Sequence, residues 1–401
     1  MLDPSLIPVL RTKPALPEVS LDLWSADVNC FYSLLVSPHF AVALWLLVAA
    51  MDRLYVAVTC RDNRACLVGA FLALLLGFVH TYDVFTVASV GIVFGVLFIL
   101  LNRHRFDAHD RLATGTKGLC FIVGCAVPVL YYAWAIHKSP ILASWAEQNR
   151  FETPGLHFYL QAFGLPAVLM LTYGQSVKRL RCGEPDILFL LTWVATVFVL
   201  MYSTAVLPFA KRLAEGLQIP IVILAVRCVY DQWLPWVQHH IRLKRWHRLA
   251  ILTGAAVLVF PTTVFLVCNT TIAATSTEPP FFVTGNELAG FEYLEQHADK
   301  AKHVLAPWKT GTILPRYTGM RVYSGHFHIT PDFKPRTRLL QKMLWGHMNE
   351  SEMLQLIREN DIGYIWLGRY RGRYAGQFPT DAPFLRLWWK RDFVSIYEVV
   401  E

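Results

Sequence analysis

The chain has 401 residues, of which 55% are hydrophobic and only 16% are charged, and its mean hydropathy is +0.38. Because a soluble domain carries about a quarter charged residues, this composition excludes an ordinary soluble protein. The formal net charge is +8, but much of the excess lies in short gaps between apolar stretches. This pattern is typical of membrane proteins and argues against a nucleic-acid partner.

Residues 1–34 contain no apolar run of useful length and no signal peptide. We expect them to form an extracytoplasmic segment ahead of the first membrane span. An outer N-terminal segment that no helix precedes is unusual, so we also expect one or more helices upstream of Met1.

Residues 35–270 are predicted to form a polytopic domain of transmembrane helices. A helix needs about 20 mostly apolar residues to cross the hydrocarbon. The stretch 65–101 is too long for one crossing, and the polar turn at 80–83 divides it into two helices. With these two, eight spans are expected, the others at 35–51, 117–136, 156–173, 185–201, 217–236 and 249–269.

Basic residues mark every second gap between the spans. Arginine and lysine concentrate in the gaps at 53–64, 103–117, 178–181 and 242–248, whereas the alternate gaps hold few or none. Basic loops stay in the cytoplasm, so these four gaps face inward. The chain then leaves its last span on the outer side of the cell inner (plasma) membrane.

Residues 280–401 are predicted to form a small extracytoplasmic α/β domain. Short strands are expected at 303–306, 321–323, 364–367 and 393–400, and helical segments at 287–298, 310–317, 336–345 and 351–359. Strands that alternate with helices favour an α/β layer over a helical bundle.

Five short sequences carry a diffuse family resemblance. They are Pro38-His39-Phe40, the turn His80-Thr81-Tyr82-Asp83, and the runs at 211–220, 318–326 and 360–366. Together they resemble bacterial membrane glycosyltransferases of the GT-C type, similar to the mannosyltransferases that use a lipid-phosphate-linked sugar. The resemblance implies a polyprenyl-phosphate-linked sugar as donor and a lipid or glycan acceptor outside the membrane. It also implies a catalytic aspartate in a first outer loop, and that loop and its helix have no counterpart in this chain.

Asp83 and His80 are the candidate catalytic residues. A carboxylate at the outer surface can act as general base on an acceptor hydroxyl, and a polar turn at membrane depth usually lines a cavity. The alternative is that Asp83 caps the helix that follows it.

Lys211 and Arg212 are the candidate phosphate ligands of the donor. They lie just before a helix start that contains Gly216, where a phosphate would meet both the guanidinium and the helix N-terminus. The alternative is that both side chains extend to the membrane interface.

Four further residues are candidate sugar or acceptor contacts. Asp22 and Asp27 flank Trp24 in the outer N-terminal segment, and Glu147 and Arg150 lie in an outer loop near Trp145. The alternatives are solvated loop charges for the aspartates and a surface ion pair for the other two.

The sequence assigns no metal ligands and no cofactor, and a divalent metal stays open. The leading hypothesis is an integral membrane glycosyltransferase, or a fragment of one, in contact with membrane lipids. The second hypothesis is a non-catalytic membrane scaffold whose outer domain binds a partner. A transporter is disfavoured, because paired broken helices and mid-membrane charges are scarce.

Overall fold

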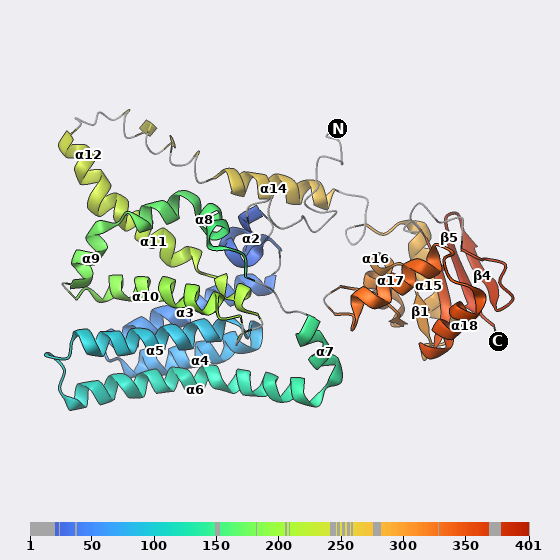
Figure 1. Ribbon diagram of the computed structural model, residues 1–401, viewed down its shortest axis with the longest axis horizontal. Helices are drawn as coiled ribbons and strands as arrows, with labels where there is room; N and C mark the ends of the chain where they lie inside the picture. The colour runs from blue at the N-terminus through green and yellow to red at the C-terminus, as the bar shows by residue number, and fades with distance from the viewer. Residues whose placement is uncertain are drawn as a thin grey trace. The chain divides into compact units, whose positions relative to one another are not determined.

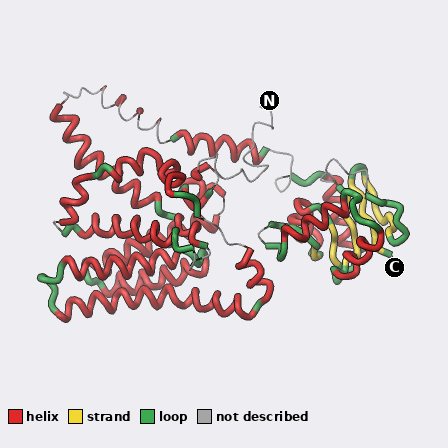
Figure 2. Tube along the Cα trace, viewed as in Figure 1, coloured by secondary structure: helices red, strands yellow, loops and turns green. Residues whose placement is uncertain are grey.

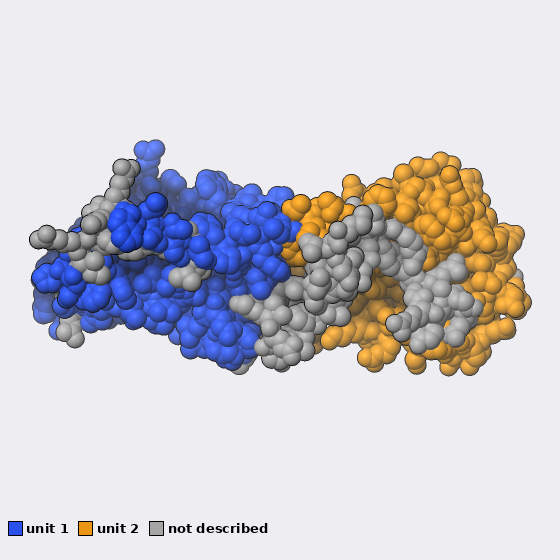
Figure 3. Space-filling model, turned by 90° about the horizontal axis from the view of Figure 1, so that it is seen from above, with its two compact units in different colours: residues 1–135, 150–268 blue, residues 136–149, 269–401 orange. Residues whose placement is uncertain are grey.

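The computed structural model describes residues 21–400, except for positions whose placement is uncertain. These are residues 24, 37, 149–152, 182, 205, 206, 208, 241–245, 247, 248, 251, 252, 255, 256, 258, 259, 276–281, 328 and 369–377. The described chain is mostly helical and carries one sheet near its C-terminus (Figures 1 and 2). It divides into two compact units, residues 1–135 with 150–268 and residues 136–149 with 269–401 (Figure 3).

Apolar helices build the first unit. In chain order the elements are the 3-10 turns η2 (Leu21–Leu23) and η3 (Ala26–Val28), then α2 (Cys30–Val36), α3 (Pro38–Thr59), α4 (Asn63–Val79), α5 (Asp83–Leu101), α6 (Ala108–Lys138), α8 (Leu156–Leu171), α9 (Gly174–Arg181), α10 (Pro185–Met201), η4 (Ala210–Ala214), α11 (Gln218–Cys228), η5 (Val229–Trp233), α12 (Leu234–His240) and α14 (Pro261–Ala274). The α6 helix runs on from this unit toward α7 (Pro140–Gln148), which belongs to the second unit.

Four of the described helical stretches are long and apolar enough to cross a membrane. They are Pro38–Thr59, Asp83–Leu101, Ala108–Lys138 and Ala210–His240, and the pair α8 and α9, bent by 58°, makes a fifth if it counts as one span. Three shorter apolar helices, α4, α10 and α14, coincide with further predicted spans. Among the described residues, length and composition therefore give four or five candidate spans, as in a membrane protein. Eight were expected, and the one at 249–269 lies partly outside the described residues.

The core of the first unit lies where α3, α4, α5, α10 and α11 pack against one another. Small residues such as Ala43, Ala50 and Ala73 are fully buried, so the helices approach closely. Large apolar side chains on the outer helix faces stay exposed, among them Trp45, Leu67 and Leu130. Exposed apolar faces of this size suit a lipid surrounding rather than water.

The second unit contains a five-stranded sheet with helices on both faces. Its strands are β1 (His303–Leu305), β2 (Arg321–Val322), β3 (Ile362–Leu367), β4 (Leu385–Arg391) and β5 (Val394–Val399), in the order β2-β1-β3-β5-β4. The β1 strand pairs in parallel with β2 and β3, whereas β5 is antiparallel to both β3 and β4. The helices are α15 (Gly285–His297), α16 (Trp308–Thr318), α17 (Phe333–Leu344) and α18 (Glu350–Glu359).

The side chains of β3 alternate between two apolar cores. Tyr364 and Trp366 pack in the core that holds residues of α15 and α16, and Ile365 and Leu367 pack in the core that holds residues of α17 and α18. This period of two lets one strand support both layers. The α/β layering predicted for this region is what the structure contains, with β4 as the strand that the prediction missed.

Candidate functional site: a buried His–Asp–Glu cluster

The turn between α4 and α5 places two ionisable side chains inside the helical unit. His80 ends α4, where its N–H donates to the carbonyl of Leu76, and Asp83 is the first residue of α5. Their side chains are only 6% and 1% exposed, and His80 Nδ1 lies 3.0 Å from Asp83 Oδ2. The helix-capping alternative for Asp83 is wrong, since Tyr82 occupies the N-cap position and the Asp83 carboxylate accepts no hydrogen bond from the helix.

Glu215 completes a three-residue cluster. It follows η4, its side chain is 1% exposed, and its Oε2 lies 3.4 Å from His80 Nδ1. One ligand atom from each of the three residues lies within 4.8 Å of the others. Within the part of the chain that the structure describes, the three side chains have no hydrogen-bond partner apart from these mutual contacts. We call His80, Asp83 and Glu215 the His80 cluster.

A strained backbone position directs Glu215 inward. Gly216 has φ +74°, a conformation that L side chains rarely adopt, and a Cβ there would meet Leu47 of α3 at 2.5 Å. Two residues later, the Gln218 Oε1 accepts a hydrogen bond from the N–H of Cys30 at 2.9 Å. The start of α11 is therefore packed against α3 and tied to α2, which fixes the approach of Glu215.

Tyr82 connects the cluster to Arg212. The centroid of the Tyr82 ring lies 5.3 Å from that of the His80 ring. The Arg212 guanidinium lies over the Tyr82 ring, 5.2 Å from its centroid. Phe209 packs on Tyr82 at 4.7 Å. The structure thus brings the predicted general base and one predicted phosphate ligand together, although they are far apart in sequence.

The cluster holds two carboxyl groups and one imidazole with almost no exposure to solvent. Asp27 lies on η3 near the cluster, and Ser25 Oγ donates to its Oδ2 at 3.3 Å.

The remaining predicted site residues have different surroundings. Lys211 is buried on η4 next to Arg212. Asp22 is buried and accepts a hydrogen bond from Thr262 at 2.6 Å, so it is not a solvated loop charge. Glu147 is exposed on α7 and belongs to the other unit. Arg150 lies outside the described residues.

Sequence reasoning did not assign Glu215 or Tyr82 to the site. The signal for Glu215 was its place between a basic pair and an apolar helix start, because a lone carboxylate at the end of a membrane helix is costly unless it is used. Tyr82 belongs to the polar turn at 80–83, but its contact with Arg212 is between residues far apart in the sequence, so the sequence could not identify it.

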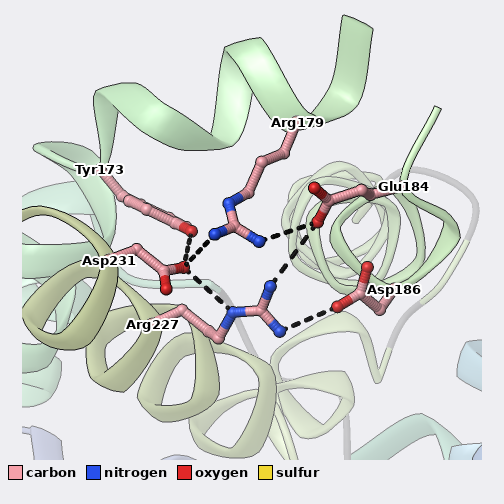
Figure 4. A network of polar contacts seen from close by, with 6 residues as sticks. All are labelled: Tyr173, Arg179, Glu184, Asp186, Arg227 and Asp231. Carbon is pink, nitrogen blue, oxygen red and sulfur yellow. Dashed lines mark hydrogen bonds and ion pairs between the residues drawn. The ribbon is translucent and has the colours of Figure 1, made fainter. Parts of the chain in front are cut away.

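A second polar network involves α9, α10, α11 and η5, as Figure 4 shows. Arg227 lies 2.9 Å from Asp186 and 3.2 Å from Asp231, and Tyr173 donates to Asp231. Arg179 lies 3.0 Å from Glu184 and 3.2 Å from Asp231. Arg227 and Asp231, four residues apart in the chain, pair with each other, and the network ties these helical segments together.

No protein-family model matches the chain, and no curated protein matches it at the level expected of a relative. The function must therefore be argued from the cluster and its surroundings.

Proposed function

We propose that the chain is an integral membrane glycosyltransferase of GT-C character, which transfers a sugar from a polyprenyl phosphate to a lipid or glycan acceptor. The observation that carries the proposal is the buried Asp83–His80 pair beside Arg212 at one end of apolar helices. Ionisable residues at such depth are expensive and are usually functional.

In the proposed reaction, the acceptor hydroxyl oxygen attacks the anomeric carbon of the donor sugar. The bond between that carbon and the phosphate oxygen breaks, and the polyprenyl phosphate leaves as an anion. The Asp83 carboxylate takes the hydroxyl proton as general base, and His80 holds the carboxylate in place through the 3.0 Å contact. Arg212, with Lys211 beside it, offsets the charge that develops on the leaving phosphate.

The proposal includes an orientation across the inner membrane. The turn between α5 and α6, which carries Arg103 and Arg105, lies at the same end of the helical unit as the turn between α9 and α10 (Figure 1). The turn between α4 and α5 lies at the other end. The basic turns would face the cytoplasm, so eight spans would place the His80 cluster and the domain at 280–401 outside.

Donor binding tests the phosphate role directly. The purified full chain in lipid nanodiscs is titrated with a polyprenyl-phosphate-linked mannose. Replacing both Lys211 and Arg212 with alanine should weaken binding by at least about 100-fold, because each charge-assisted hydrogen bond contributes about 1.5–3 kcal/mol and about 1.4 kcal/mol is a factor of ten. Lys178→Ala, which removes an exposed charge on α9, should leave the affinity unchanged.

One result would contradict this role: equal donor affinity for the wild type and for a double variant that elutes as a folded species. If the wild type binds no polyprenyl-phosphate sugar of any kind, the scaffold hypothesis becomes the better one.

A further inference from the structure

We infer that the His80 cluster binds a divalent transition-metal ion through one imidazole nitrogen and two carboxylate oxygens. The inference deepens the proposed function: the role given below to the ion in donor binding rests on that function. The binding of the ion itself does not.

The spacing of the donor atoms suits a metal. Ligand atoms that lie about 2.0–2.2 Å from a tetrahedral ion are roughly 3.3–3.5 Å from one another. His80 Nδ1 lies 3.0 Å from Asp83 Oδ2 and 3.4 Å from Glu215 Oε2, and all three donors fall within 4.8 Å. Small rotations of the Asp83 and Glu215 side chains would therefore complete the ligand set.

The burial of the three side chains, and the lack of other hydrogen-bond partners for them among the described residues, point to a bound ion. All three side chains are more than nine-tenths buried, and neither carboxylate has a hydrogen-bond donor from elsewhere in the described chain. Buried carboxylates without hydrogen-bond donors are strongly disfavoured. A divalent ion bound by all three groups would offset the charge of both carboxylates.

The donor types select the metal class. One imidazole with two carboxylates suits ions such as Mn²⁺ or Zn²⁺, because Mg²⁺ and Ca²⁺ prefer all-oxygen ligands. Three protein ligands leave at least one coordination position open, as in catalytic metal sites. Under the proposed function, a phosphate oxygen of the donor would take that position. The Asp83 oxygen that is not bound to the ion would then accept the proton of the acceptor hydroxyl.

A second group of possible metal ligands in the described chain must be distinguished from the His80 cluster in any binding measurement. Asp107, His109 and Asp110 also meet the distance requirement, but they are exposed or half-exposed. Asp110 pairs with Arg61 and its N–H donates to Asp107 Oδ1. These groups have partners and carry no inference, yet they can bind metal weakly in an assay.

The test measures metal on the full chain without any donor. The protein in nanodiscs, with Asp107→Asn and Asp110→Asn as background, is stripped by chelation and dialysed against Mn²⁺ or Zn²⁺. Elemental analysis should then find one ion per chain. Replacing Glu215 with glutamine, or Asp83 with asparagine, should weaken binding at least tenfold, and Asp186→Asn should leave it unchanged.

A spectroscopic measurement on the protein with unaltered cluster residues covers the case in which a variant does not fold. Pulsed electron paramagnetic resonance of the Mn²⁺-loaded protein should show coupling to one directly bound imidazole nitrogen. The inference is overturned if no stoichiometric ion is held, if the ion shows no nitrogen coupling, or if a folded Glu215→Gln variant keeps its ion.

The donor titration, repeated with and without Mn²⁺, separates the two proposals. Tighter donor binding with the ion supports both. Stoichiometric metal without donor binding refutes the glycosyltransferase proposal and keeps the metal site. If the protein holds no ion and donor binding depends on Lys211 and Arg212 but not on metal, the metal site is refuted and the proposed function is kept.

Discussion

Glu215 and Gly216 show how a single backbone position can hold a costly side chain. Glu215 is buried beside a second carboxylate, which is unfavourable unless the chain forces the approach. Gly216 allows the turn that follows Glu215, because its φ of +74° is one that L side chains rarely adopt and a Cβ there would meet the end of the Leu47 side chain at 2.5 Å. The approach of Glu215 therefore depends on a residue without a side chain.

The change Gly216→Ala should destabilise the protein by about 1–3 kcal/mol, from the strain of a positive φ and the clash with Leu47. The thermal unfolding midpoint of the purified chain is the measurement. Gly95→Ala in α5 is the matched control, since a Cβ there meets nothing within 4 Å, and its midpoint should stay equal or rise. Equal midpoints for the wild type and Gly216→Ala would contradict this reading of the turn.

On the scale of elements, α15 rests on the sheet through a glycine. A Cβ at Gly290 would lie 2.7 Å from the Trp366 ring, which is fully buried and stacks on Phe291. The helix begins with a capping box in which the side chains of Thr284 and Glu287 bond each other's backbone N–H groups. The capping box fixes the residue at which α15 begins, and Gly290 allows the helix to lie close to Trp366 of β3.

Gly290→Ala should therefore destabilise the C-terminal unit by about 1–3 kcal/mol, because the buried rings cannot move aside without opening the core. Limited proteolysis of the full chain during a temperature ramp reports the unfolding of residues 285–400. Gly285→Ala in the same helix meets open space and should unfold at the wild-type temperature. A Gly290→Ala variant as resistant as this control would show that the packing of α15 is looser than described.

The network around Arg227 joins four helical segments, α9, α10, α11 and η5, and removing the charge of Arg227 should loosen them. Its groups are about a third exposed, so Arg227→Met should cost only about 1 kcal/mol. The loss appears as a lower denaturation midpoint in mixed micelles. Arg64→Met, exposed in the first turn of α4, should have no effect, and equal midpoints for the two variants would mean that the network adds nothing to stability.

Sequence reasoning predicted the helix break at 80–83, because a polar run cannot continue an apolar span. It also predicted the helical segment at 310–317, which the structure contains as α16 and which ends at Gly319 with φ +67°. It missed β4, since Trp388 and Trp389 stand together at a bulge rather than alternating with polar residues. Glu215 was missed for another reason: its contact with His80 is tertiary, and no local pattern encodes it.

For the whole molecule, two separately packed units share one chain. The helical unit exposes large apolar side chains, whereas the C-terminal unit buries its apolar residues in two cores around the sheet. The exposed apolar surface of the first unit is compatible with a lipid surrounding. We expect the basic turns, which resist translocation, to decide which side of the membrane each end faces.

Reporter fusions test this orientation. A reporter inserted near Arg103 should be cytoplasmic, and one fused after Glu401 should be extracytoplasmic, because basic turns resist translocation. The enzymatic activity of each reporter in intact cells is the readout. If the fusion after Glu401 is active only in the cytoplasm, the His80 cluster faces the wrong side for a sugar transfer outside the cell.

The most direct test of the central claim is sugar transfer by the purified chain in proteoliposomes, with a polyprenyl-phosphate-linked sugar and lipid acceptors. We predict transfer by the wild type, a loss of at least about 100-fold in Asp83→Asn, as expected for removal of a general base, and near wild-type transfer in Asp186→Asn. Transfer by Asp83→Asn at the wild-type rate would contradict the assignment of the His80 cluster as the reaction centre.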